Sequence, residues 1–217
     1  MYRIENNRLA LLFMLLTAFI PGSISASDCD SFNLSEVAPG IYVHIGQHVS
    51  IEHEQRDDIA NIGFIVGSRC IAVIDTGGSV AIGKQLLAKI RSISDKPVCY
   101  VINTHIHYDH LLGNRAFVDE QPVFVGHHAL AAAVEQNREF FVSEFGPSLG
   151  DKPDASAIIA PGKLVEDMLQ LDLGGRSLTL KAYPVSHSHN DLIVIDNQTK
   201  TLWSGDLVFR QRTPSLT

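Results

Sequence analysis

The sequence has few cysteines, a single tryptophan and no run of basic residues. Its 217 residues include three cysteines, Cys29, Cys70 and Cys99, and none of them forms a C-x-x-C pair. This small, odd number excludes a scaffold held together by several disulfides. Lysine and arginine number 17 against 24 acidic residues, a formal net charge of -7, which argues against nucleic acid as a partner.

The one long apolar run, Leu9–Ile20, stands near the start of the chain. Basic residues precede it, and Pro21-Gly22 and small residues follow it, which is the order typical of a secretory signal peptide. Its 12 residues would form about 18 Å of helix, short of the ~30 Å hydrocarbon core, so a permanent membrane anchor is the weaker interpretation. We expect residues 1–26 to be a signal peptide and residues 27–217 to be one domain, exported across the inner membrane to the periplasm. An oxidising compartment permits one disulfide, and the sequence leaves its pairing open.

The rest of the chain alternates short β-branched runs with segments of helical periodicity. Phe64–Val66 and Ile71–Ile74 predict a hairpin, and Ser79 is a candidate cap for the helix that follows. A buried strand is expected at Val98–Ile102. Further on, the pattern predicts a short helix at 111–116, a strand at 123–125, a helix at 129–141, a long surface loop at 144–164, and hairpins at 169–185 and 191–209. This order is typical of an α/β sandwich with a site along one sheet edge.

Histidine is abundant, with ten residues, and three of them lie between positions 105 and 110. His105 and His107 are two residues apart on an extended segment, so their imidazoles leave the backbone on the same side and can bind one cation. Asp109 and His110 turn away, as in a chain that enters a helix, and offer a carboxylate and an imidazole to a second cation. Neutral imidazoles and carboxylates at such spacing predict a zinc site.

Other segments offer further ligands at the ends of predicted strands. His187 lies in a separate loop, where His189 is the competing candidate, and Asp206 follows the last apolar strand. Asp75 follows the strand at 71–74 and is expected to orient a ligand imidazole and not to bind metal itself. The remaining histidines are weak candidates, and they are His44, His48, His53, His127 and His128.

These motifs together resemble the metallo-β-lactamase-fold superfamily over residues 37–209. The likeness is carried by the run from His105 to His110, the HSHNDL segment, the SGDLVF segment and the DTG that begins at Asp75. It implies an αβ/βα sandwich with two zinc ions. By position, His105, His107 and His187 would bind the first ion, Asp109 and His110 the second, and Asp206 both. Relatives have the histidine four residues before Asp191, which favours His187 over His189.

The resemblance also extends to a narrower branch. The NIGFIVG and SGDLVFRQRTPSL segments, with the export signal, look most like the exported quinoprotein-relay zinc metallohydrolases, which implies a periplasmic quinoprotein partner. Relatives continue past the strand that ends near Phe209 and supply another histidine to the second metal, whereas no histidine follows His189 here. The resemblance therefore implies a sandwich without its last C-terminal elements. Either the sequence is truncated, or the second zinc ion is held by fewer protein ligands.

The function that this pattern predicts is zinc-dependent hydrolysis of a small ester, thioester, lactone or amide-like substrate by a metal-bound hydroxide. Asp109 is the candidate catalytic residue, because its carboxylate can orient the hydroxide and relay its proton. Two alternatives remain. One is a mononuclear iron sulfur dioxygenase on the same fold, and the other is a non-catalytic, zinc-binding partner of a quinoprotein system. Loops 48–57 and 144–164 are expected to shape the substrate pocket.

Overall fold

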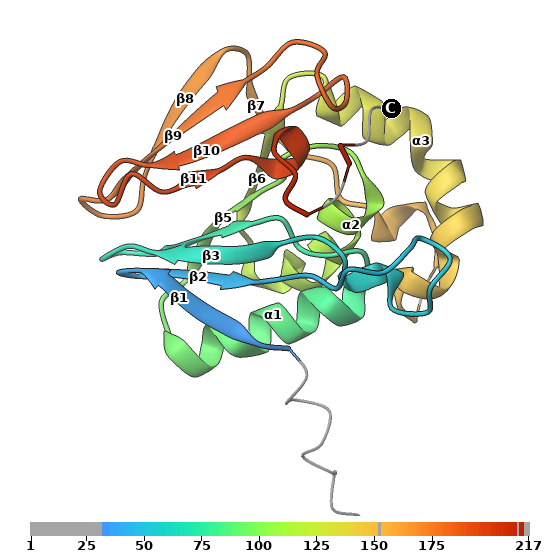
Figure 1. Ribbon diagram of the computed structural model, residues 1–217, viewed down its shortest axis with the longest axis horizontal. Helices are drawn as coiled ribbons and strands as arrows, with labels where there is room; N and C mark the ends of the chain where they lie inside the picture. The colour runs from blue at the N-terminus through green and yellow to red at the C-terminus, as the bar shows by residue number, and fades with distance from the viewer. Residues whose placement is uncertain (1–31, 152, 212, 215–217) are drawn as a thin grey trace, which may run out of the picture. The chain divides into compact units, whose positions relative to one another are not determined.

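Figure 1 shows the computed structural model, which describes residues 32–151, 153–211 and 213–214. The expected signal peptide at 1–26 and Cys29 lie outside the described residues. The described residues belong to one compact unit. No helix in the described part of the chain is long and apolar enough to span a bilayer.

The first sheet has seven strands in sequential order. They are β1 Leu34–Ala38, β2 Ile41–His44, β3 Ile62–Val66, β4 Ile71–Ile74, β5 Val98–Ile102, β6 Val123–His127 and β7 Lys163–Val165. Strands β1 to β4 pair antiparallel, which confirms the hairpin predicted at 64–74. Strands β4 to β7 pair parallel, as expected where helices connect them. The carboxyl ends of β4, β5 and β6 therefore meet at one edge of the sheet.

The second sheet has four antiparallel strands in the order β11-β10-β9-β8. They are β8 Met168–Asp172, β9 Ser177–Ala182, β10 Leu192–Asp196 and β11 Leu202–Trp203. The pairings of β8 with β9 and of β10 with β11 confirm the two later hairpins. Alternating burial along β9 shows why the sequence alternates there, since one face contacts the other sheet.

Helices connect the parallel strands. Helix α1 is Val80–Ile93, and the Oγ of Ser79 accepts a hydrogen bond from the amide of Ile82, which confirms the predicted cap. The remaining helical elements are α2 Tyr108–Leu111, α3 Leu130–Phe145 and the 3-10 helices η2 Arg56–Asp58, η3 Leu112–Glu120, η4 Gly146–Leu149, η5 Ala155–Ala157 and η6 Gly205–Leu207.

The prediction of a long surface loop at 144–164 is wrong, because the segment contains regular structure. Helix α3 continues to Phe145, two 3-10 turns follow, and β7 begins at Lys163. The physical reason is packing, because Leu149 and Ile158 are buried against Phe141 and other residues of α3. The two 3-10 turns in this segment therefore contribute to a small third core.

Two larger cores define the layers of the sandwich. One lies between the sheets and includes Ile41, Ile65, Leu180 and Val194. The other lies between the first sheet and α1 and includes Phe64 and Leu86 among its fully buried side chains. Figure 1 shows α1 on the face of the first sheet that turns away from β8–β11. The order helix, sheet, sheet matches the predicted α/β sandwich.

A buried ion pair joins the two sheets at the end where β3 and β10 finish. Arg176 donates to both carboxylate oxygens of Asp196, at 2.8 and 3.1 Å. Its Nη1 also donates to the carbonyls of Pro39 and Val66, both at 3.0 Å. We call this group the Arg176 clamp. Nearby, at the start of β4, Cys70 forms a disulfide with Cys99, which resolves the pairing that the sequence left open.

Candidate metal centre

The predicted site residues meet at the end of the sandwich opposite the Arg176 clamp. Asp75 follows β4, His105 and His107 follow β5, His187 lies between β9 and β10, and Asp206 follows β11. Backbone hydrogen bonds join these segments, from the amide of Asp75 to Ile102 and from the amide of Leu192 to Thr104. The backbones of three strands thus fix where these side chains begin.

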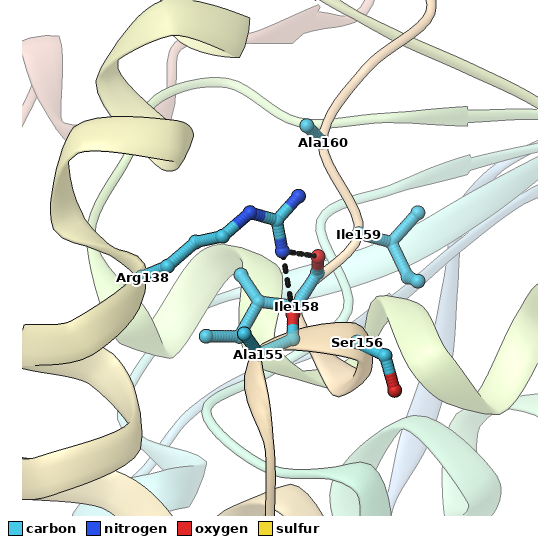
Figure 2. Close-up of a pocket in the computed structure, with 6 residues that line it drawn as sticks. All are labelled: Arg138, Ala155, Ser156, Ile158, Ile159 and Ala160. Atoms are coloured by element: carbon cyan, nitrogen blue, oxygen red, sulfur yellow. Dashed lines mark hydrogen bonds between the residues drawn. The ribbon is translucent and has the colours of Figure 1, made fainter.

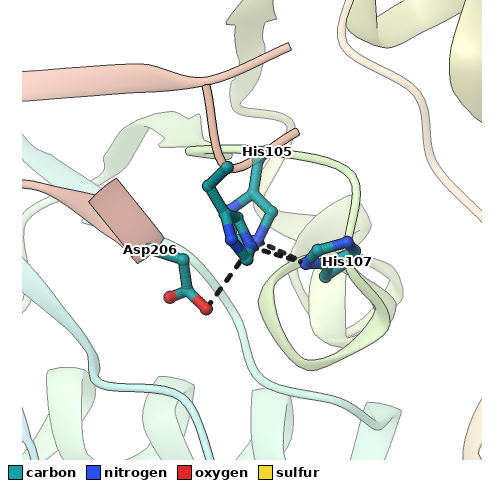
Figure 3. A group of neighbouring side chains, drawn as sticks. His105, His107 and Asp206 are labelled. Atoms are coloured by element: carbon teal, nitrogen blue, oxygen red, sulfur yellow. Dashed lines mark hydrogen bonds and ion pairs between the residues drawn. The ribbon is translucent and has the colours of Figure 1, made fainter. Parts of the chain in front are cut away.

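Three imidazoles converge on one point. The Nε2 atoms of His105 and His187 each lie 2.9 Å from Nδ1 of His107. The carboxylate of Asp206 completes the group, and the four ligand atoms all lie within 4.8 Å of one another. Figure 3 shows His105 and His107, which lie on one segment, and Asp206, which lies on another, turned toward one another. It is the one such group among the described residues.

This arrangement fits a cation better than it fits hydrogen bonds between the rings. A ring nitrogen carries either one proton or one lone pair, so Nδ1 of His107 cannot satisfy the Nε2 atoms of both His105 and His187. Three lone pairs that face one point are what a tetrahedral zinc ion requires, with ligand atoms about 3.3 Å apart at bond lengths of 2.0–2.1 Å. Burial and the neighbouring imidazoles lower the pKa of His105 well below its usual value, and that of His107 is lowered too. Both rings are therefore neutral ligands.

Asp75 and Thr104 set the tautomers of two of these rings. The Asp75 carboxylate accepts from the Nδ1 of His110 at 2.8 Å and from the hydroxyl of Thr104 at 2.7 Å. Because that hydroxyl donates its hydrogen bond to Asp75, its oxygen is free to accept from the Nδ1 of His105, 3.1 Å away. The Nε2 atoms of His105 and His110 consequently face the cluster. Asp75 has a left-handed φ of 53°, a conformation that few residues other than glycine adopt.

A second group of candidate ligands lies beside the first. The Nε2 atom of His110 is buried without a hydrogen bond, 3.3 Å from Asp206 and 3.4 Å from Asp109. Burial acts to lower the pKa of His110, yet Asp109 and Asp75 hold it well above its usual value. Burial acts to raise the pKa of Asp206, but the adjacent charge of His110 lowers it. Carboxylates around a buried imidazole make this a place that favours positive charge.

The structure thus brings together all the residues predicted for the site. His105, His107, His187 and Asp206 form the first group, Asp109 and His110 adjoin it, and Asp75 lies behind His110. Their roles as ligands, and that of Asp109 in catalysis, stay predictions.

The weaker histidine candidates lie outside the four-residue group. His189 is exposed, in contrast to buried His187. His127 is buried, and its two ring nitrogens pair with the carbonyl of Tyr183 and the amide of Ala129. The presence of a histidine in the sequence was therefore not enough to predict membership of the four-residue group.

Sequence reasoning missed two residues that hold the ligands in place. Thr104 is one of them. The feature of the sequence that could have indicated it is its position, as a polar residue between an apolar strand and the first histidine. Asp191 is the other, because its carboxylate accepts from the amide and the hydroxyl of Ser188 at 2.8 and 2.9 Å. Those bonds fix the loop that carries His187. The sequence pointed to Asp191 only as a spacing marker.

A cavity of about 520 Å³ opens beside this centre. Asp109, His110 and Asp206 line one part of it, and residues of β1, β2 and β11 line another. Of the two segments expected to shape the pocket, only His48 from 48–57 contributes, and 144–164 does not.

The second of those segments is held elsewhere by an arginine. Figure 2 shows Arg138 of α3 bonded to the carbonyls of Ala155 and Ile158, at 2.5 and 2.6 Å. These bonds keep residues 155–160 in a separate surface pocket beside α3.

Comparison with known proteins agrees with this fold. A model of the metallo-beta-lactamase superfamily matches residues 56–217. The chain belongs to this superfamily. Among solved structures, a metallo-beta-lactamase from Pontibacter korlensis superposes with a TM-score of 0.65 at 18% identity, covering 84% of this chain and 74% of that one. At that identity the likeness shows the fold alone.

Two curated relatives belong to different kinds of hydrolase. A linear primary-alkylsulfatase of a Pseudomonas strain is 45% identical over 56 residues, 26% of this chain and 11% of the relative. The acyl-coenzyme A thioesterase MBLAC2 of Bos taurus is 31% identical over 168 residues, 69% of this chain and 58% of the relative. The chain thus spans little more than half of the thioesterase and a small part of the sulfatase.

Proposed function

We propose that the protein is an exported, zinc-dependent hydrolase of a small ester, thioester, lactone or amide-like substrate. The observation that carries this proposal is the convergence of three imidazole nitrogens and the Asp206 carboxylate within 4.8 Å. Membership of the metallo-beta-lactamase superfamily supports a metallohydrolase, and the names of the two relatives, a thioesterase and a sulfatase, support hydrolysis.

The residues divide into two groups of ligands. His105, His107 and His187 would hold a first zinc ion, Asp109 and His110 a second, and Asp206 both. Bound zinc polarises a carbonyl and lowers the pKa of water toward about 7. The Asp75 and Thr104 hydrogen bonds engage the Nδ1 atoms of His110 and His105 and aim the Nε2 atoms of both rings at the centre.

Asp109 is placed to handle the proton of the attacking water. Its carboxylate lines the cavity and lies 3.4 Å from the Nε2 of His110. It can orient a water molecule toward a carbonyl carbon in the cavity and accept the proton that the water loses. The same carboxylate then returns the proton to the departing alkoxide, thiolate or amine. A serine or cysteine nucleophile is not needed in this scheme.

Export is supported by two separate features. The basic and apolar start of the sequence is typical of a signal peptide. The Cys70–Cys99 disulfide is of the kind that persists in oxidising compartments. We extend the proposal to the periplasm and to a quinoprotein partner, for which the support is the sequence resemblance of the NIGFIVG and SGDLVFRQRTPSL segments.

A second candidate function is oxygen-dependent sulfur chemistry at a single iron ion. The observation in its favour is that just one four-residue ligand group occurs in the described residues, and Asp109 and His110 lie outside it. Three imidazoles and a carboxylate suit iron as well as zinc.

Metal analysis combined with a substrate panel tests these proposals. We expect about two zinc ions per chain and turnover of at least one ester, thioester, lactone or β-lactam. One iron ion with oxygen uptake would instead support the dioxygenase. Zinc binding without turnover of any substrate would support a non-catalytic partner protein.

The Asp109→Asn variant tests the assigned base. We expect turnover to fall by about 10²–10⁴ with only modest loss of zinc, because a carboxylate that accepts the proton is replaced by an amide of equal size. Asp119→Asn is the matched control, since Asp119 is exposed and lies ten residues further along the chain. Unchanged turnover in Asp109→Asn, measured at equal zinc content, would refute the role.

A further inference from the structure

The cavity beside the metal centre continues along an apolar wall that the proposed chemistry does not use. This wall is formed by Val37 of β1, Val43 of β2, Ile45, Trp203 of β11 and Val208. The same cavity includes Asp109, His110 and Asp206, so the apolar wall and the candidate metal ligands share one space. A molecule in it can contact both.

The exposure of this wall is unusual for the protein. Eleven large apolar side chains are markedly exposed among the described residues, and four of them line this one cavity. They are Val37, Ile45, Leu202 and Val208, exposed by 54%, 57%, 53% and 67%. Scattered apolar side chains are ordinary on a surface, whereas apolar side chains that gather around a hollow indicate a binding site.

The charges around the cavity are unevenly placed. The carboxylates that line it, those of Asp75, Asp109 and Asp206, belong to the candidate metal centre. Arg210 is the one lysine or arginine among the described lining residues. A substrate with several anionic groups would find a single lysine or arginine there, whereas an uncharged chain would match the apolar wall. The cavity volume of about 520 Å³ is within the range of ~300–1,000 Å³ that small-molecule sites occupy.

We propose that this wall, which we call the acyl groove, binds the uncharged, straight hydrocarbon chain of an acyl ester or thioester. The proposal rests on the proposed hydrolase function, because it places the scissile carbonyl at the metal centre. Hydrolysis breaks the acyl C–O or C–S bond and adds the oxygen of water to the acyl carbon. The alcohol or thiol leaves with a proton, and the product carboxylic acid keeps the hydrocarbon chain. A straight-chain alkanoate is therefore a product analogue that the groove should bind.

The sequence supplies a direct probe of binding. Trp203 is the only tryptophan of the protein and lines the cavity, so its fluorescence reports on this place alone. We expect alkanoates of increasing length to shift its emission. Each added methylene should lower Kd about fourfold until the groove is full, the factor that burial of one CH₂ gives. Titrations of chelator-treated protein and of zinc-loaded protein should show the same dependence on length.

A matched pair of variants locates the site. Ile45→Asn places an amide in the groove, whereas Ile51→Asn makes the same change at an isoleucine that is 58% exposed and does not line the cavity. We expect Ile45→Asn to raise the Kd of a long alkanoate at least about tenfold and Ile51→Asn less than about twofold. Equal effects of the two variants, or a Kd that does not depend on chain length, would overturn the proposal.

The outcomes separate this proposal from the proposed function. If zinc-loaded protein hydrolyses short esters but binds no alkanoate, the acyl groove is wrong and the hydrolase proposal stands. If alkanoates bind with the expected length dependence but no ester or thioester is hydrolysed, the groove stands as a binding site and the hydrolase proposal fails. A third outcome is that the Trp203 signal changes with protein concentration and that sedimentation detects dimers, which Ile45→Asn dissociates. This outcome would assign the wall to a second copy of the chain and overturn the acyl groove.

Discussion

The two ends of the β-sandwich bury ionisable side chains in opposite ways. At the Arg176 clamp, the guanidinium donates to Asp196 and to two carbonyls, and Asp196 also accepts from the amide and hydroxyl of Thr199. At the metal centre, two Nε2 atoms face the same Nδ1 of His107, and the Nε2 of His110 lacks a hydrogen bond. The hydrogen bonds of the clamp are all made within the protein, and we call this the closed end of the sandwich. Those of the metal centre are not all made, and we call it the open end.

The difference shows how buried polar groups can be assigned to stability or to function. A buried charge is tolerated when its hydrogen bonds are made within the protein, as at Asp196. A buried group whose bonds remain unmade costs free energy, so its persistence indicates a ligand. The same strands, β3, β4 and β10, run from one network to the other, which explains how the rigid clamp end supports a centre built on loops.

The largest expected effect comes from removing a candidate metal ligand at the open end. His187→Ala should remove a candidate ligand and lower turnover by at least about a thousandfold, because the several kcal/mol that a metal contributes are lost. Zinc content and kcat would be measured together. His189→Ala is the control, since His189 is exposed and only two residues away. If His189→Ala loses zinc and His187→Ala does not, the ligand assignment is wrong.

The next largest effect comes from removing the arginine of the closed end. Arg176→Met should leave the Asp196 carboxylate buried without its partner and reduce the free energy of unfolding by about 3–5 kcal/mol. Urea denaturation measures this, and zinc content per folded chain should be unchanged. The double variant with Asp196→Leu should regain most of the loss, because it removes the unpaired charge as well. A loss below about 1 kcal/mol would mean that the clamp is not a tight network.

A smaller effect weakens the open end from behind. Thr104→Val removes the hydroxyl that links Asp75 to His105, so the His105 tautomer is no longer fixed. We expect zinc affinity to fall about 10–100-fold in a competition assay with a chelator. Thr179→Val on β9 is the control, since its hydroxyl bonds to Asn197. Equal zinc affinities in the two variants would contradict the orienting role of Thr104.

The smallest expected effect concerns the hydrogen-bonded pair His44 and Asp58, which lies near the open end. Burial acts to lower the pKa of His44, but its hydrogen bond to Asp58, 2.6 Å long, and the carbonyl of Asn33 raise it. The folded pKa therefore exceeds the unfolded value of about 6.5, so the stabilisation is complete below that pH and is lost as pH rises through the folded pKa.

We expect this loss to be about 1 kcal/mol or less, measured as the urea midpoint from acidic to alkaline pH. His44→Gln should flatten the dependence above about pH 6, because it removes the titrating ring. A wild-type midpoint that rises over the same interval would contradict the sign.

Much of the fold could be predicted from local sequence. Alternating β-branched runs separated by Gly67, Gly174 and Gly175 predict hairpins, since these patterns depend on neighbours along the chain. The Ser79 cap is equally local. The segment at 144–164 was mispredicted because its burial depends on packing against α3 and against Leu111 and Leu112, which no local pattern in the segment shows.

The chemistry of the centre was partly local as well. His105, His107, Asp109 and His110 lie within six residues, so their spacing alone predicts ligands for metal. His187 and Asp206 were candidates from their places at the ends of predicted strands, and the superfamily resemblance favoured His187 over His189. No local spacing connects either residue to that run.

The sequence by itself determined which side chains could bind a metal, and only the tertiary structure decided how they meet. The Cys70–Cys99 disulfide, the Asp75–His110 hydrogen bond and the His107–His187 contact join residues 29, 35 and 80 positions apart. Such pairings depend on the register of distant strands and on the cores that fix it, and neither is written in any short stretch of sequence. The acyl groove belongs to the same class, because β1, β2 and β11 form its wall only after the two sheets have packed.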